Sequence, residues 1–214
     1  MGFLDYIFSN FGRVLEMSLE HAMYVLMSVA ISALIGVTLG VLVHHRPALA
    51  SITTAICATI LTVPSFALFG LMVAWVGLGN LSAVIALTAY ALLPIVRNTI
   101  TGLQELDPAI VESAQGMGMS SAQRLVKVQL PLAWPVIIAG LRVSTMLVVS
   151  IFAIANYVGA DGLGSEIFRG LSNIGSVWAE DVVLASTVMI VIVALVLDAG
   201  YKLLERFTTP RGIR

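Results

Sequence analysis

The residues that could do chemistry in this chain are few, and none is arranged as a catalytic or metal site. Its two lysines follow Val126 and Tyr201, so the sequence lacks the Gly-Lys-Ser or Gly-Lys-Thr of a nucleotide-binding P-loop. The histidines (His21, His44 and His45) form no zinc-type HExxH pattern, and no Gly-x-Ser-x-Gly occurs. We therefore expect no catalytic residues, no cofactor and no metal in this polypeptide.

A polar segment between two strongly apolar blocks carries the more informative pattern. Asp107 followed by Pro108 predicts a helix start, because aspartate caps a helix and proline suits its first position. Gly116 and Gly118 can end that helix, because glycine readily adopts the left-handed conformation. A structured polar loop in an otherwise apolar chain is suited to receive force from a soluble partner.

A second short helix is predicted directly after these glycines. Ser120 and Gln123 have the three-residue spacing of a capping box, and the helix should run to about Val128. Leu130-Pro131 should stop it, since the residue before a proline is disfavoured in the helical region. The loop is thus expected to hold two short helices joined by a sharp elbow.

The composition places the rest of the chain in a membrane. Of its 214 residues, 59% are hydrophobic and 11% are charged, with a mean hydropathy of +1.01. Soluble domains carry about 25% charged residues, so the excess apolar surface must face lipid. The net charge is −1 and the basic residues form no run, which argues against a nucleic-acid partner. The single cysteine, Cys57, has no partner for an internal disulfide.

We predict an all-α membrane protein with five transmembrane helices. A span needs about 20 largely apolar residues. The candidate spans are Ala22–Val43, Ala48–Leu78, Leu81–Val96, Val136–Val158 and Val182–Leu204. The second is expected to be one tilted or kinked helix, because Pro64 removes an intrahelical hydrogen bond.

The domain organisation follows from these spans. Residues 1–20 have a helical apolar period and should form an amphipathic extracytoplasmic segment. Residues 21–205 form the five-span domain, with the polar loop at 99–135. Residues 206–214 are expected to form a cytoplasmic tail.

The basic residues predict the orientation of the chain. If the polar loop is cytoplasmic, only Arg13 and Arg169 fall on the outer side. The basic residues at or near the inner side are then Arg46, Arg97, Arg124, Lys127, Arg142, Lys202, Arg206, Arg211 and Arg214. The positive-inside rule therefore places the N-terminus outside and the C-terminus in the cytoplasm.

The polar loop resembles that of a known family. The pattern Glu112-x-Ala114-x3-Gly118-x9-Val128-x-Leu130-Pro131 is similar to the EAA loop of membrane subunits of ATP-binding-cassette importers. Ser113 stands where the family more often has alanine. The resemblance implies a type I importer permease fold whose coupling helices dock on a separate ATPase subunit. The ATPase-coupling residues would be Glu112, Ser113, Ala114, Gly118, Leu130 and Pro131.

A narrower resemblance points to permeases for osmoprotectants. It rests on Leu92–Thr99, Gly116–Met119, Gly162–Gly170 and Thr209–Gly212. It implies import of glycine betaine, carnitine or choline by a complex with a second permease subunit, identical or paralogous. Two ATPase subunits and an extracytoplasmic substrate-binding protein, which would select the solute, complete the implied complex. The alternatives are a permease for an amino acid such as methionine, an ATP-independent secondary transporter or a membrane scaffold.

Uncharged polar and aromatic side chains are the candidates for a translocation pathway. An aromatic face can attract a quaternary ammonium through a cation–π interaction. The candidates are Pro64, Ser65, Tyr90, Thr145, Ser150, Asn156 and Tyr157, with Thr145, Ser150 and Asn156 expected on the fourth span. Asp198 should pair with Lys202 one helical turn away. Arg142 should snorkel or bond loop carbonyls. The segment Gly159–Asp181 either folds over the outer mouth or is a plain connector.

Overall fold

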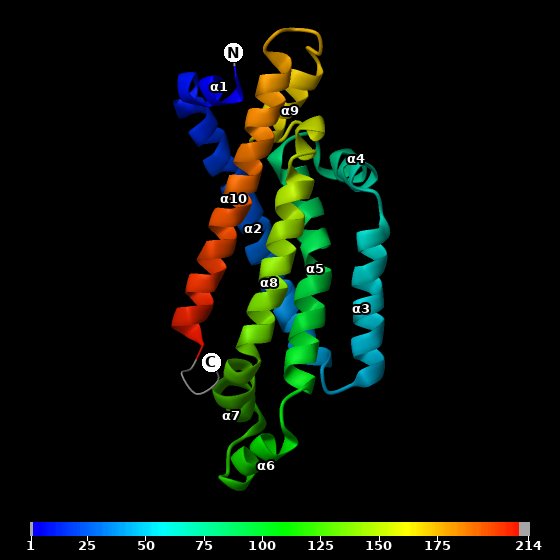
Figure 1. The fold of residues 1–214 in the computed structure, drawn as a ribbon. Coiled ribbons are helices and arrows are strands. Elements are labelled where there is room, and N and C mark those ends of the chain that lie inside the picture. The colour runs from blue at the N-terminus through cyan, green and yellow to red at the C-terminus, as the bar shows by residue number, and fades with distance from the viewer. Residues whose placement is uncertain (1, 210–214) are drawn as a thin grey trace.

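The structure is a computed structural model that describes residues 2–209, and this range contains helices and no strand (Figure 1). The helices are α1 (Phe3–Ser9), α2 (Phe11–Val43), α3 (Pro47–Thr62), α4 (Ser65–Val76), α5 (Asn80–Gln104), α6 (Pro108–Gly116), α7 (Ser121–Arg124), the π-helical turn η1 (Leu125–Gln129), α8 (Leu130–Phe152), the 3-10 turn η2 (Ala155–Val158), α9 (Gly164–Leu171) and α10 (Ala179–Thr208). Residues 210–214, which include part of the predicted tail and of the Thr209–Gly212 motif, lie outside the described residues.

The long helices form an elongated bundle in which α5 lies between α2, α3 and α8 (Figure 1). Helices α6 and α7 lie at one end of the bundle, and α1, α4 and α9 lie at the other. In the described part of the chain, α2, α5, the continuous α7–α8 helix and α10 are long and apolar enough to span a membrane. The bent pair α3–α4 supplies up to a fifth span. The predicted all-α membrane fold is confirmed.

The second span differs from the prediction. We expected one kinked helix over Ala48–Leu78, but the chain breaks at Pro64 and α4 turns 95° from α3. Val63, before the proline, takes an extended conformation (φ −66°, ψ 129°), as sterics require. The Tyr90 hydroxyl donates a hydrogen bond of 2.7 Å to the Val63 carbonyl, which compensates for the helical bond lost there. Helix α4 therefore lies across the end of the bundle rather than continuing α3 (Figure 1).

The predicted end of the second loop helix at Leu130-Pro131 is also wrong. Helix α7 passes through the π-turn η1 directly into α8, and the Leu130 amide donates to the Leu125 carbonyl. Pro131 directly follows this π-turn, so the residue without an N–H group lies where the regular hydrogen-bond pattern is already interrupted. The loop is therefore joined to α8 as one continuous helix.

Close contacts between α2, α5 and α8 depend on glycine. Gly36 and Gly40 are one turn apart on α2 and are buried against α5. A Cβ atom on Gly40 would lie 2.6 Å from Cγ2 of Thr99. On the other side of α5, a Cβ on Gly140 of α8 would lie 2.7 Å from Cβ of Asn98. Small residues at such spacing let helix backbones approach closely in membranes, where no hydrophobic effect drives helices together.

Replacing Gly40 with leucine should separate α2 from α5. The new side chain overlaps a β-branched residue that cannot move aside, and overpacking of this kind costs about 1–3 kcal/mol. The melting temperature of the purified protein in detergent should fall. Gly70→Leu is the matched control, because nothing lies within 4 Å of a Cβ at that exposed position. Equal melting temperatures for the two variants would contradict the predicted helix contact.

Candidate functional site: the α6–α7 loop and the α3–α5 groove

The first loop helix begins as the sequence predicts. The Asp107 side chain accepts a hydrogen bond of 2.9 Å from the Ala109 amide, and Pro108 is the first helical residue. Ala114 is the buried residue of α6, whereas Glu112 and Ser113 are exposed. The loop helix therefore presents its polar side chains outward and packs its small apolar residue inward.

The elbow between the two loop helices is formed by glycine. Gly118 has a φ of +80°, a left-handed conformation that L-residues with side chains rarely adopt. Its amide donates to the Gln115 carbonyl, and the Met119 amide donates to the Ala114 carbonyl. Ser120 then caps α7 in a reciprocal capping box with Gln123, as predicted. The direction of the chain at this point is thus fixed by backbone hydrogen bonds.

Side-chain hydrogen bonds hold the loop in shape and join the ends of the helices beside it. The Arg124 guanidinium donates to the Met119 carbonyl at 3.3 Å. Gln104, at the end of α5, donates to the His44 carbonyl at 2.8 Å and links the ends of α5 and α2. Burial lowers the pKa of His44, so this ring is neutral at pH 7. A cavity of about 420 Å³ separates the end of α2 from α7, and His44, His45 and Arg124 contribute to its lining.

The six predicted coupling residues do not form one patch. Glu112, Ser113 and Gly118 are exposed, whereas Leu130 and Pro131 are half-buried at the start of α8. The structure adds exposed apolar side chains that the sequence reasoning had not assigned to coupling. They are Ile110, Met117 and Val126, which are 42%, 71% and 61% exposed. An apolar surface of this kind on a polar loop is typical of a protein contact.

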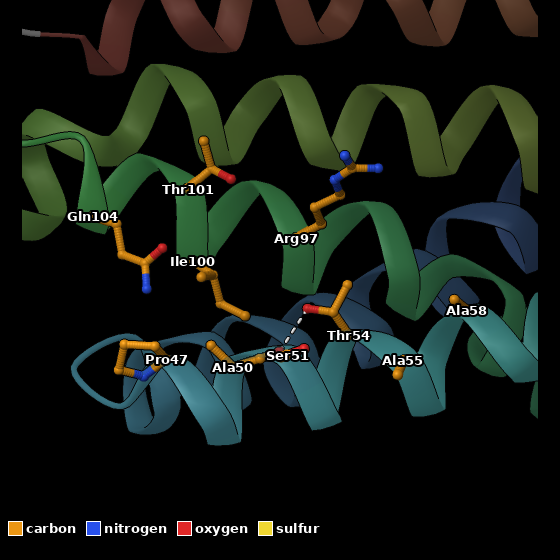
Figure 2. A pocket seen from close by; sticks show the side chains of 10 residues that line it. All are labelled: Pro47, Ala50, Ser51, Thr54, Ala55, Ala58, Arg97, Ile100, Thr101 and Gln104. Atoms are coloured by element: carbon orange, nitrogen blue, oxygen red, sulfur yellow. Dashed lines mark hydrogen bonds between the residues drawn. The ribbon is translucent and has the colours of Figure 1, made fainter.

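A groove between α3 and α5 opens on the side of the bundle (Figure 2). Its volume is about 460 Å³. Its lining residues are Pro47, Ala50, Ser51, Thr54, Ala55, Ala58, Arg97, Ile100, Thr101 and Gln104. No predicted pathway residue belongs to this groove. The sequence feature that could have pointed to this groove is Arg97, a charged residue close to a span. In the sequence analysis Arg97 contributes only to the predicted orientation.

Two of the predicted pathway residues are buried in the bundle. Tyr90 is 2% exposed, and its hydroxyl donates a hydrogen bond to the Val63 carbonyl. Thr145 is fully buried on α8, and its hydroxyl lies 2.8 Å from the Tyr201 hydroxyl of α10. Ser150 is exposed on α8 and donates to the Met146 carbonyl at 3.3 Å.

Other predicted pathway residues lie near the α4 end of the bundle. Asn156 lies in η2 and not on the fourth span, so that placement was wrong. Tyr157 also lies in η2, and the centroid of its ring is 5.1 Å from the centroid of the Phe66 ring. Phe66 directly follows Pro64 and Ser65, so the structure brings Tyr157 next to the break between α3 and α4. Phe66 is 48% exposed and Tyr157 is 68% exposed.

An ion pair between α8 and α10 was not anticipated. Arg142 Nη2 donates to Asp198 Oδ2 at 2.8 Å, and its Nε contacts the other carboxylate oxygen. The expectation that Arg142 snorkels or bonds loop carbonyls is therefore wrong. The predicted Asp198–Lys202 pair is confirmed at 3.1 Å. Asp198 therefore forms ion pairs with both Arg142 and Lys202.

A second charged cluster joins the elements at the opposite end of the bundle. Glu166 of α9 is 1% exposed, and its Oε1 lies 2.6 Å from Nη2 of Arg13 on α2. Its other oxygen accepts a hydrogen bond of 2.6 Å from Tyr6 of α1 and contacts Arg169. Burial and this carboxylate raise the pKa of Tyr6 to about 12, so the hydroxyl keeps the proton that it donates. The segment Gly159–Asp181 therefore contains a helix that is anchored to the N-terminal helices.

Comparison with known proteins agrees with this architecture. The osmoprotectant import permease protein OsmW of Salmonella typhimurium is 38% identical over 100% of both chains. The carnitine transport permease protein OpuCB of Listeria monocytogenes is 36% identical over 96% of this chain and 92% of the relative. The choline transport system permease protein OpuBB of Bacillus subtilis is 34% identical over 99% of this chain and 95% of the relative.

Solved structures share the fold. An inward-facing structure of the MetNI methionine ABC transporter superimposes with a TM-score of 0.79 and 23% identity, over 95% of this chain and 98% of that one. This likeness shows that the chain has the type I ABC importer permease fold. The chain belongs to the family of inner membrane components of binding-protein-dependent transport systems, whose pattern matches residues 32–210.

Proposed function

We propose that this chain is the translocation subunit of an ATP-driven importer for an osmoprotectant such as glycine betaine, carnitine or choline. The observation that carries the proposal is the full-length similarity to permeases named for these solutes. ATP hydrolysis belongs to a separate ATPase subunit, since the sequence has no P-loop. An extracytoplasmic binding protein delivers the solute.

The α6–α7 loop is the coupling element in this proposal. Its outward Glu112 and Ser113, with the exposed Met117, form the surface for the ATPase subunit. Ala114 and Gly118 hold the loop in shape, and Leu130 and Pro131 join it to α8. Because α7, η1 and α8 are continuous, a displacement of the loop reaches the membrane without passing through a flexible link.

The pathway lies between two permease subunits, identical or paralogous, because five helices alone are too few to enclose a solute. Pro64, Ser65 and Tyr157 are placed near one mouth, where the Phe66 and Tyr157 rings offer exposed faces to a quaternary ammonium. Ser150 is accessible on α8. Tyr90, Thr145 and Asn156 would act by holding the surrounding helices in place. In this proposal, ATP binding draws the two ATPase subunits together and changes the permease pair from inward-facing to outward-facing. ATP hydrolysis then returns the pair to the inward-facing state.

The orientation proposed from the basic residues is consistent with the arrangement of the helices. The α6–α7 end carries Arg46, Arg124 and Lys127 and faces the cytoplasm. The α9 end, with Arg13 and Arg169, faces outward. The N-terminus is then outside and the C-terminal end of α10 is inside.

Uptake by the reconstituted complex tests the proposal. Vesicles holding this chain, its ATPase and its binding protein should accumulate labelled glycine betaine, carnitine or choline only when ATP is supplied. Vesicles with this chain alone should accumulate none. Uptake without any ATPase would refute the assignment, and uptake of methionine but of no osmoprotectant would favour the amino-acid alternative.

A further inference from the structure

One face of α5 is only partly covered by the other helices that the structure describes. Leu81, Ile85, Ala89, Leu93, Arg97 and Thr101 follow one another every four residues along it. All are exposed or half-buried, whereas the opposite face packs against α2 and α8. The face is apolar through Leu93 and becomes polar at Arg97. Of the six residues that define this face, Arg97 is the charged one, and it lies where the face changes from apolar to polar.

Arg97 directly follows the predicted span Leu81–Val96, and α5 continues beyond it. It is seven residues before Gln104, the last residue of α5, which is about 10 Å at 1.5 Å per residue. The Arg97 side chain borders the open groove, whose lining offers it no acidic partner. In Figure 2, Arg97 and Thr101 extend from α5 on the side away from α3, and Ser51 and Thr54 line the α3 side of the groove.

No carboxylate neutralises Arg97 in the described part of the chain. The groove lining contains no acidic residue. The other arginine in a span, Arg142, is paired with Asp198. An unpaired cation at the end of a span is costly if it is drawn into the hydrocarbon region, and charged residues near that region often mark a substrate or ion pathway. Among residues 2–209, Arg97 therefore has no ion-pair partner, and its guanidinium can bind an anion supplied by a solute.

We propose that Arg97 binds the carboxylate of a zwitterionic solute as that solute passes the inner half of the pathway. This inference rests on the proposed function. A guanidinium can bind a carboxylate through two parallel hydrogen bonds. The groove volume of about 460 Å³ admits a small solute, and the Ser51 and Thr101 hydroxyls of its lining can donate hydrogen bonds to a carboxylate, whereas the Thr54 hydroxyl already donates to the Ala50 carbonyl. A cation without a carboxylate gains nothing from Arg97 and is repelled by it.

Glycine betaine and carnitine carry a carboxylate, whereas choline does not, so these solutes provide the test. In the reconstituted complex, Arg97→Gln should lower the maximal uptake rate of glycine betaine and carnitine about tenfold. Choline uptake should be unchanged or faster. The apparent KM should change little, because the binding protein sets it. Arg97→Lys should keep part of the betaine rate, because it keeps the charge but not the planar guanidinium.

Arg46→Gln serves as the matched control, because it removes an exposed cation at the same end of the bundle but outside the groove. An equal loss for all three solutes would overturn the inference and leave the proposed function standing. If Arg97→Gln fails to assemble with the ATPase, the betaine-to-choline ratio of Arg97→Lys decides in its place, and an unchanged ratio refutes the role. Wild-type transport of choline alone overturns the inference, and transport of no osmoprotectant overturns the proposed function as well.

Discussion

Replacing Gly118 with valine is expected to abolish ATP-driven uptake while the chain still inserts into the membrane. Gly118 has a φ of +80°, and a β-branched residue is a strong outlier there. No atom lies within 4 Å of a Cβ built at this position, so the new side chain meets no obstacle. The penalty, about 1–2 kcal/mol or more, is therefore one of backbone conformation. The elbow would relax and α6 would change direction relative to α7.

The spans are unaffected by this change, because Gly118 lies outside all of them. We expect normal amounts of the variant in the membrane fraction, but weak copurification with the ATPase or uncoupled ATP hydrolysis. Gly116→Val is the matched control, since Gly116 also has no atom within 4 Å of a Cβ and its φ is not positive. Gly118→Asn should be intermediate, because asparagine tolerates the left-handed region. Normal uptake by Gly118→Val would show that the elbow geometry is not needed for coupling.

Local signals explain which parts of this fold could be predicted. The caps at Asp107 and Ser120 act through atoms two or three residues away, so the sequence contains all of the relevant interactions. The spans likewise follow from apolar composition over short windows. The glycine elbow was accessible for the same reason, since Gly118 was expected to end α6.

Features that depend on distant partners could not be predicted in this way. A proline can kink or break a span, and here Tyr90, 27 residues from Val63, stabilises the broken form. The Arg142–Asp198 pair joins residues 56 positions apart. The groove beside Arg97 exists only because α3 lies next to α5. Each of these features depends on how helices pack, and helical periodicity alone does not specify helix neighbours.

Removing the Glu166 carboxylate is expected to release the N-terminal helices from α9. This side chain is 1% exposed and contacts Tyr6 of α1, Arg13 of α2 and Arg169 of α9. The Arg13 and Arg169 side chains are 50% and 37% exposed, so water can solvate them once the carboxylate is gone. The expected loss is therefore that of charge-assisted hydrogen bonds, about 1.5–3 kcal/mol, rather than that of a fully buried pair.

Limited trypsin digestion of the purified protein measures this release, because Arg13 is itself a cleavage site. Because about 1.4 kcal/mol corresponds to a factor of ten, the expected loss of about 1.5–3 kcal/mol should make cleavage of Glu166→Gln after Arg13 at least about tenfold faster. Glu16→Gln, which removes an exposed carboxylate from the same end of α2, should be cut at the wild-type rate. Arg13 is the protease site and must be retained, so Tyr6→Phe supplies the complementary change. It removes one donor to Glu166 and should accelerate cleavage less than Glu166→Gln does. If Glu166→Gln and Glu16→Gln are cut equally fast, the cluster does not hold the N-terminal helices in place.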